Sequence, residues 1–143
     1  MSTKPTVFYT AHATATGDGR NGHVATDDGL VDHDLATPKP FGKPTKTNPE
    51  QLFAAGYSAC FNSAFQGAAK LLKGKLVEST VTARVGIGPV ALNRFGLGVK
   101  LHVTAVGIDQ ETAERVAEKA EQMCPYSNAT RGNIPVDIEV SVR

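Results

Sequence analysis

The sequence has no tryptophan, only two cysteines, and no long run of apolar residues or of charges of one sign. Without an apolar run of roughly 18 residues it offers no candidate membrane span. Its first residues, MSTKPTVFYT, also lack the apolar core of a secretory signal peptide. The net charge of +1 comes from scattered single charges, which leave no footprint for nucleic acid or an anionic membrane surface. We therefore expect a cytoplasmic protein that binds neither nucleic acid nor membrane.

The scarcity of cysteine and the spacing of histidine exclude two further kinds of site. Cys60 and Cys124 are too few for the disulfide framework of a secreted protein and too far apart for a CxxC motif. In a reducing compartment, a disulfide between them would be transient and catalytic rather than structural. The four histidines stand singly, without a second ligand at metal-binding spacing, so we expect no metal site.

The order of secondary-structure signals predicts the fold class. The 143 residues suit one compact domain, 1–143, with a core of its own. Strand patterns occupy residues 6–16, 23–26, 30–35, 77–87, 95–108 and 134–142, and helix patterns occupy 48–73 and 109–124. Gly88 and Pro89 are expected to end one strand, and Pro125 the second helix. Strand runs without regular βαβ alternation predict an α+β fold with mainly antiparallel sheets.

The segment from Asn48 to Lys73 is the best-specified helix in the chain. Asn48 is a favourable N-cap, Pro49 suits the first helical position, and Gly74 is expected to end the helix. After Glu50 the helix carries no charge until Lys70, which predicts a long buried central helix. Small residues form a stripe that lets another backbone approach closely: Gly56, Cys60, Ala64 and Gly67.

The residues alone leave two interpretations of Cys60. It is either a small, inert core residue or a reactive thiol, and a reactive thiol needs a group that lowers its pKa. Arg20, on the glycine-rich turn of residues 17–22, is a candidate cation, although a solvated turn residue is the simpler interpretation. Glu50 either orients such a cation or only serves the helix N-terminus.

Two long stretches resemble the signature motifs of the OsmC/Ohr family, in its branch of organic hydroperoxide resistance proteins. They are TNPEQLFAAGYSACF at residues 47–61 and CPYSNATRGNI at residues 124–134. The resemblance runs in order over nearly the whole chain. It implies that Cys60 is the peroxidatic cysteine and Cys124 the resolving cysteine. It also implies that Arg20 stabilises the thiolate and the peroxide, while Glu50 orients Arg20.

The same resemblance implies a cofactor-free thiol peroxidase. Its substrates would be organic hydroperoxides, for example those of fatty acids, which the apolar Leu52, Phe53 and Phe61 near the thiol would favour. The implied reductant is an external dithiol, such as lipoyl groups on a protein partner. One departure concerns the loop at Lys43-Pro44-Thr45-Lys46, which resembling proteins tend to make glycine-rich. We expect this altered loop to affect the rim of the substrate pocket and not the chemistry of the thiols.

Helix geometry adds an expectation about assembly. Ten residues separate Glu50 from Cys60, which is roughly 15 Å along one straight helix and about 80° short of three full turns. An unbroken helix therefore cannot bring both side chains to one arginine within a single chain. We predict an intertwined two-fold homodimer whose sites combine Glu50 of one chain with Cys60 and Cys124 of the other.

Two alternative functions stay open at this point. One is an OsmC-type peroxidase of broader specificity, against which the stretch YSNATRGNI argues. The other is a non-enzymatic thiol redox switch that uses the same cysteine pair, although no DNA-binding element accompanies it. Steady-state turnover of an organic peroxide with a dithiol separates an enzyme from a switch.

Overall fold

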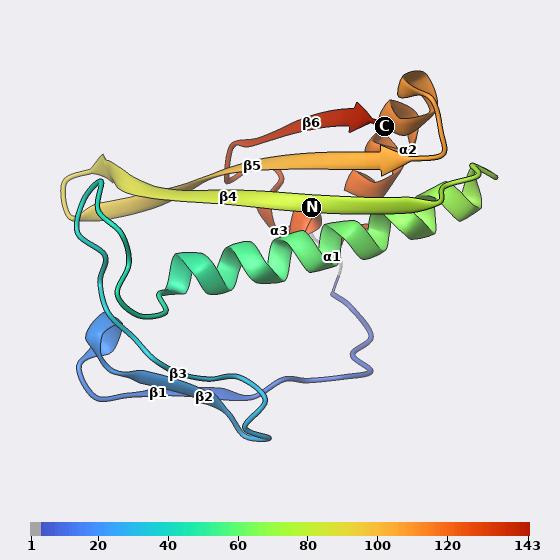
Figure 1. The fold of residues 1–143 in the computed structure, drawn as a ribbon. Coiled ribbons are helices and arrows are strands. Elements are labelled where there is room, and N and C mark those ends of the chain that lie inside the picture. The colour runs from blue at the N-terminus through green and yellow to red at the C-terminus, as the bar shows by residue number, and fades with distance from the viewer. Residues whose placement is uncertain (1–3) are drawn as a thin grey trace. The chain divides into compact units, whose positions relative to one another are not determined.

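The computed structural model describes residues 4–143, which divide into two compact units. One unit extends to Pro49 and the other comprises Glu50–Arg143 (Figure 1). The single domain expected over 1–143 stays a prediction. The α+β fold class expected from the sequence is confirmed, since each unit has a three-stranded sheet and the second also has the helices.

The N-terminal unit is a small antiparallel sheet of strands β1 (Ala13–Thr16), β2 (His23–Thr26) and β3 (Asp32–Asp34). The predicted strand at residues 6–16 forms only in its last four residues, and the one at 30–35 only in three. A β-branched sequence becomes a strand only where a neighbouring strand supplies ladder hydrogen bonds, which explains both shortenings.

The central helix is confirmed as α1 (Pro49–Leu71), with Pro49 at its first position. It ends in a Schellman motif, in which Gly74 N–H bonds to Ala69 O and Lys73 N–H to Lys70 O. The left-handed residue is Lys73, with φ of 57°, and not the expected Gly74. Only one face of α1 is buried, by Tyr57, Phe61, Ala64, Phe65, Ala68 and Ala69. The opposite, uncharged face is exposed in the single chain, at Ala55, Ala59 and Ser63.

The C-terminal unit contains the sheet β4-β5-β6, made of β4 (Glu78–Ala91), β5 (Arg94–Val106) and β6 (Val136–Val142). Strand β4 does not end before Gly88 as predicted, because it runs through Pro89 to a bulge and a tight turn. Proline is tolerated here because β4 is an edge strand, whose outward N–H groups need no ladder partner.

Strands β5 and β6 are parallel and are joined by two helices, α2 (Gln110–Met123) and α3 (Pro125–Thr130). The predicted cap is confirmed: the Asp109 carboxylate accepts a hydrogen bond of 2.8 Å from Thr112 N–H. The predicted stop is confirmed as well, since α2 ends at Met123. The short helix α3 was not predicted, and Pro125 occupies its first turn. The sheets are thus mainly antiparallel, with one parallel pair.

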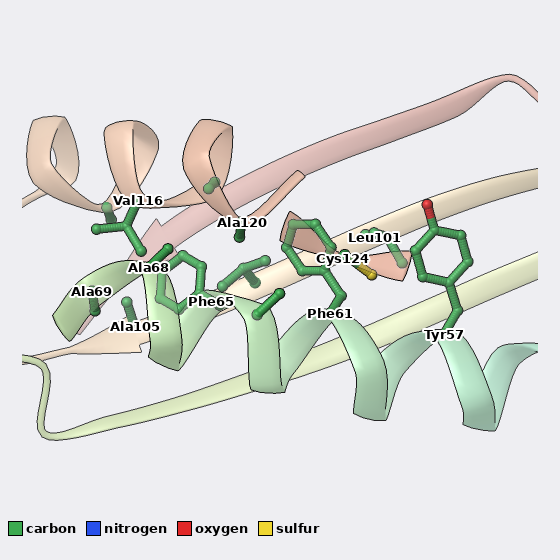
Figure 2. Close-up of a cluster of buried hydrophobic side chains, with 14 of the residues drawn as sticks. Tyr57, Phe61, Phe65, Ala68, Ala69, Leu101, Ala105, Val116, Ala120 and Cys124 are labelled. Carbon is green, nitrogen blue, oxygen red and sulfur yellow. The ribbon is translucent and has the colours of Figure 1, made fainter. Parts of the chain in front are cut away.

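Helices α1 and α2 pack on one face of this sheet and enclose the core. Figure 2 shows the central side chains, which include Tyr57, Phe61, Phe65, Leu101, Ala105, Val116, Ala120 and Cys124. The other face of the sheet is polar, with a Lys100–Glu139 ion pair of 2.9 Å. This unit is therefore a two-layer structure, and Cys124 is part of its core.

Candidate functional site: a pair of thiols between α1 and the α2–α3 junction

Cys60 lies in the middle of α1, at the border of its buried face. The neighbouring core residues Tyr57 and Phe61 are fully buried, while Cys60 itself is only partly buried. The strong N-terminal signals of α1 fix the phase of the helix, and the apolar spacing decides which face turns inward. Cys60 is thereby held against the core with one side accessible.

Cys124 lies at the junction of α2 and α3 and is fully buried. Its backbone N–H bonds to Ala120 O at the end of α2, and its dihedral angles are extended, with φ of −72° and ψ of 121°. The residue before a proline disfavours helical angles, so Pro125 places the break between the two helices at Cys124. The change of direction carries the side chain toward α1.

The two thiols face each other. The Sγ atoms of Cys60 and Cys124 are 3.6 Å apart, and both cysteines are free. A disulfide has an S–S distance of about 2.05 Å, so the sulfurs would approach by roughly 1.5 Å to form the bond. The pair suggested by the resemblance is therefore brought together within one chain.

The surroundings of Cys60 raise the pKa of its thiol above the ordinary value. Burial is the largest cause, and the neighbouring Cys124 thiol acts in the same direction. The backbone N–H of Tyr126 opposes them, since it donates a hydrogen bond to the sulfur and lowers the pKa. These groups together favour the neutral thiol, so a thiolate at Cys60 needs a cation in addition.

A buried set of hydroxyl groups joins α1 to α3 next to the thiols. The Tyr57 hydroxyl lies 2.9 Å from Ser127 Oγ and 3.1 Å from Thr130 Oγ1. The Thr130 hydroxyl donates to the Ser127 carbonyl oxygen at 3.2 Å. These three hydroxyls, which we call the hydroxyl cluster, satisfy one another inside the core.

Aromatic rings cover α1 on the N-terminal side of Cys60. Phe53, Tyr57 and Tyr126 form three ring pairs with centroids 5.5 to 6.1 Å apart. Of the apolar neighbours expected at the thiol, Phe53 belongs to this cluster, whereas Phe61 is fully buried in the core. Phe53 and Tyr126 are therefore the better candidates for a wall against which the organic part of a substrate would pack.

Arg20 lies in the N-terminal unit, in a 3-10 turn at Gly19–Asn21. The turn needs its glycines, because Gly17 and Gly19 have positive φ and a Cβ on Gly22 would collide with the Thr16 carbonyl oxygen. Glu50 lies in the first turn of α1, ten positions before Cys60 on a helix without a break. The association of Arg20 and Glu50 with the thiols stays a prediction.

Sequence reasoning missed the Tyr126 N–H group and the hydroxyl cluster. A signal for the cluster is present in retrospect: Tyr57 precedes Cys60 by three residues, and Ser127 follows Cys124 by three. No local pattern indicates that these positions meet, because the contact joins segments about 70 residues apart.

Residues 4–143 contain no group of three or more histidine, cysteine or acidic side chains arranged to hold a metal ion. Among the same residues, no helix is both long enough and apolar enough to cross a membrane.

Comparisons with known proteins agree with the fold and the motifs. The family profile described as OsmC-like protein matches residues 42–139. An organic hydroperoxide resistance protein of Xanthomonas axonopodis pv. citri is 45% identical over 144 residues, covering 99% of this chain and 100% of that protein. The crystal structure of an organic hydroperoxide resistance protein from Elizabethkingia anophelis superposes with a TM-score of 0.90 at 51% identity, covering 97% of this chain and 100% of that chain. OhrB of Bacillus subtilis gives a TM-score of 0.85 at 39% identity, covering 94% and 100%.

Proposed function

Because the chain belongs to the OsmC-like family and has organic hydroperoxide resistance proteins as close relatives, we propose that it is a thiol peroxidase that reduces organic hydroperoxides. A role in organic hydroperoxide resistance follows from these relatives. The observation that carries the enzymatic proposal is the pair of free thiols, with Cys60 Sγ and Cys124 Sγ 3.6 Å apart and Cys60 partly accessible.

The proposed reaction begins at Cys60. Its thiolate attacks one oxygen of the hydroperoxide, the O–O bond breaks, and the other oxygen leaves as the alcohol after taking a proton. Cys60 is then a sulfenic acid, two electrons more oxidised. The buried Cys124 thiol attacks that sulfur, water leaves, and a Cys60–Cys124 disulfide results. An external dithiol reduces the disulfide and restores both thiols, and no cofactor takes part.

Arg20 and Glu50 have the supporting roles in this proposal. Because the groups around Cys60 raise the pKa of its thiol, the thiolate needs a cation, and Arg20 on its glycine-rich turn is the proposed one. A guanidinium donates two parallel hydrogen bonds to a carboxylate, so Glu50 would fix its orientation. The Arg20 guanidinium would also bind the peroxide oxygens.

The site is proposed to lie at the interface of a two-fold homodimer. The unbroken α1 places Glu50 roughly 15 Å along the axis from Cys60, too far for one arginine to touch both in one chain. The uncharged face of α1 at Ala55, Ala59 and Ser63 is exposed in the single chain. Large apolar side chains are also exposed at the β4–β5 hairpin, namely Ile87, Val90, Leu92 and Phe95. Such surfaces favour burial against a second copy.

The substrate and the reductant are proposed from chemistry. The aromatic cluster beside Cys60 suits an alkyl or acyl chain better than it suits hydrogen peroxide. A dithiol, such as dihydrolipoyl groups on a protein partner, reduces a protein disulfide through a mixed disulfide and then closes on itself.

A turnover assay tests the proposal. The purified protein is given dihydrolipoamide as reductant and either tert-butyl hydroperoxide or hydrogen peroxide as oxidant. We expect continuous turnover with a higher kcat/KM for the organic peroxide. Equal efficiency with both peroxides would favour an OsmC-type enzyme of broader specificity. A single oxidation without turnover would favour a redox switch and contradict the peroxidase.

A further inference from the structure

Two contacts of the same spacing join α1 to the segment that starts at Cys124. Cys60 meets Cys124, and three residues earlier on α1 Tyr57 meets Ser127, three residues after Cys124. Residues three apart on a helix lie on one face, so each segment presents two adjacent positions to the other. The sulfur pair and the hydroxyl pair are thus neighbouring cross-links between the same two segments.

The hydroxyl cluster attaches the buried face of α3 to α1. The buried residues of this helix are Ser127 and Thr130, and both are polar. Pro125 is exposed, while Tyr126 is 37% exposed and its ring packs against Phe53 and Tyr57. Besides this aromatic contact, the hydrogen bonds to Tyr57 hold the buried face of α3 against α1. In an interior of low dielectric constant such bonds are strong, and a partner left without one is costly.

One arrangement of donors and acceptors uses every hydroxyl proton of the cluster. The Thr130 hydroxyl donates to the Ser127 carbonyl oxygen, so its oxygen is free to accept from Tyr57. The Tyr57 hydroxyl has one proton, and donating it to Thr130 leaves its oxygen to accept from Ser127. In this arrangement two hydrogen bonds join the Tyr57 hydroxyl to α3, one to Ser127 and one to Thr130.

We propose that the Tyr57 hydroxyl, with Ser127 and Thr130, is a positioning device for the resolving step, which holds Cys124 against Cys60. The proposal rests on the proposed peroxidase function and assigns to these residues a role in its second half. In that half the Cys124 thiol attacks the Cys60 sulfenic acid, the S–S bond forms, and the sulfenic oxygen leaves as water with the thiol proton. A second peroxide competes for the same sulfenic acid and oxidises it to sulfinic acid.

The test compares wild type with Tyr57→Phe, which removes one oxygen and keeps the ring. Reduced protein is mixed with increasing tert-butyl hydroperoxide and quenched with an alkylating agent. Intact-mass spectrometry then gives the fractions of disulfide and sulfinic acid. We expect the peroxide concentration that diverts half of the protein to sulfinic acid to fall about 3- to 10-fold, the factor equivalent to one ordinary hydrogen bond.

Ser79→Ala is the matched control. Ser79 is also a buried hydroxyl that ties α1 to another element, through Asn62 at 2.6 Å and Gln66 at 3.3 Å, but it lies at β4. It should lower stability without changing the partition between disulfide and sulfinic acid. An unchanged partition in Tyr57→Phe, or an equal change in both variants, would overturn the proposal. If Tyr57→Phe does not fold, Ser127→Ala replaces it, with the same expectation.

Diamide separates failure of this inference from failure of the peroxidase proposal. It oxidises two nearby thiols to a disulfide and takes up their two protons and two electrons, without a peroxide or a sulfenic acid. Tyr57→Phe should slow diamide-driven disulfide formation relative to wild type and Ser79→Ala. Slower disulfide formation in Tyr57→Phe, together with no peroxide turnover in wild type, would reject the peroxidase proposal and support the positioning role. If diamide forms the disulfide equally fast in Tyr57→Phe and wild type, and wild type turns over peroxide normally, the positioning role is rejected and the peroxidase proposal stands.

Discussion

Gly56 and Tyr126 lie so close that a Cβ atom on Gly56 would stand 2.5 Å from the Tyr126 hydroxyl oxygen and 3.0 Å from the ring carbon that bears it. The missing side chain on α1 is therefore what lets the tyrosine ring lie across the helix, one turn before Cys60. Tyr126 is also the residue whose backbone N–H bonds to the Cys60 sulfur. The position of the ring and the hydrogen bond to the thiol are consequently linked.

Gly56→Ala should displace Tyr126 and weaken the hydrogen bond to Cys60. Overpacking costs about 1–3 kcal/mol, and over most of that range it outweighs the roughly 1 kcal/mol that alanine gains over glycine in a helix. We expect lower stability in urea and a higher pKa of Cys60 in alkylation assays. Gly67→Ala on the same helix is the control, because its Cβ would lie 3.4 Å from the flexible end of Met123. Equal stability of the two variants would contradict the clash.

Substitution of the two cysteines separates their roles. Cys60→Ser should abolish peroxide reduction, because no thiolate remains to attack the O–O bond. Cys124→Ser should react once and then accumulate sulfinic and sulfonic acid at Cys60, since no internal thiol captures the sulfenic acid. Mass spectrometry after peroxide treatment measures both. Multiple turnover of Cys60→Ser with a dithiol would show that the assignment is wrong.

Arg20→Ala should raise the pKa of Cys60 to at least that of a free cysteine, about 8.5. Burial and Cys124 would then act on the thiol without an opposing cation. The folded chain would keep a proton that the unfolded chain loses, so this group's contribution to stability would decline as the pH rises above about 8.5. The rate of alkylation against pH measures the pKa.

Arg131→Ala is the control for that experiment. Its guanidinium donates to Asn128 Oδ1 at 2.7 Å and to the Glu121 carbonyl oxygen at 2.8 Å. It is therefore engaged at the end of α2, and its removal should leave the alkylation profile unchanged. A shift with Arg131→Ala and none with Arg20→Ala would assign the thiolate to the other arginine.

His23 should titrate above its ordinary pKa. Its Nδ1 lies 2.8 Å from Asp34 and its Nε2 2.8 Å from Asp32, and the hydrogen bond to Asp34 is the largest cause of the shift. The stabilisation is fully present below the unfolded pKa of about 6.5 and is lost as the pH rises through the folded value. The pKa of Asp34 is lowered by the same contact, so its contribution is lost as the pH falls. In NMR titrations Asp34→Asn should lower the His23 pKa more than Asp32→Asn does.

A mixed dimer tests whether each site is shared between chains. Glu50→Ala and Cys60→Ser chains are co-expressed with different tags, and the mixed dimer is purified. If each site combines residues of both chains, one of the two sites in the mixed dimer keeps both Glu50 and Cys60. We then expect about half the wild-type activity for the mixed dimer and little activity for each parent homodimer. A mixed dimer as inactive as its parents would place Glu50 and Cys60 in one chain, which an unbroken α1 does not permit.

The elements that the sequence predicted well are those with local signals. Asp109 caps α2, Pro49 begins α1, and alternation marks β4 and β5. The ends of the strands were predicted less well, because they depend on which neighbouring strands are available for pairing. Residues 6–12 have strand composition but form no strand, and β4 continues through Pro89 because that edge needs no partner.

The thiol pair followed from the resemblance, and the local sequence alone left an inert Cys60 open. What brings the sulfurs together is the docking of α2 and α3 on α1, a tertiary arrangement that no window of sequence contains. The hydroxyl cluster was missed for the same reason, because Tyr57 lies about 70 residues before Ser127 and Thr130 in the sequence. Only the fold shows that their hydroxyl groups meet.

The parallel pairing of β5 with β6 has a consequence for the order of events during synthesis. Cys124 lies in the crossover between these strands, so its position against Cys60 is secured when β6 pairs beside β5. A ribosome makes Cys60 long before it makes β6. A nascent chain therefore carries Cys60 without the neighbouring Cys124 thiol for about 80 residues of translation, and the two sulfurs come within reach of each other only after the last strand has paired.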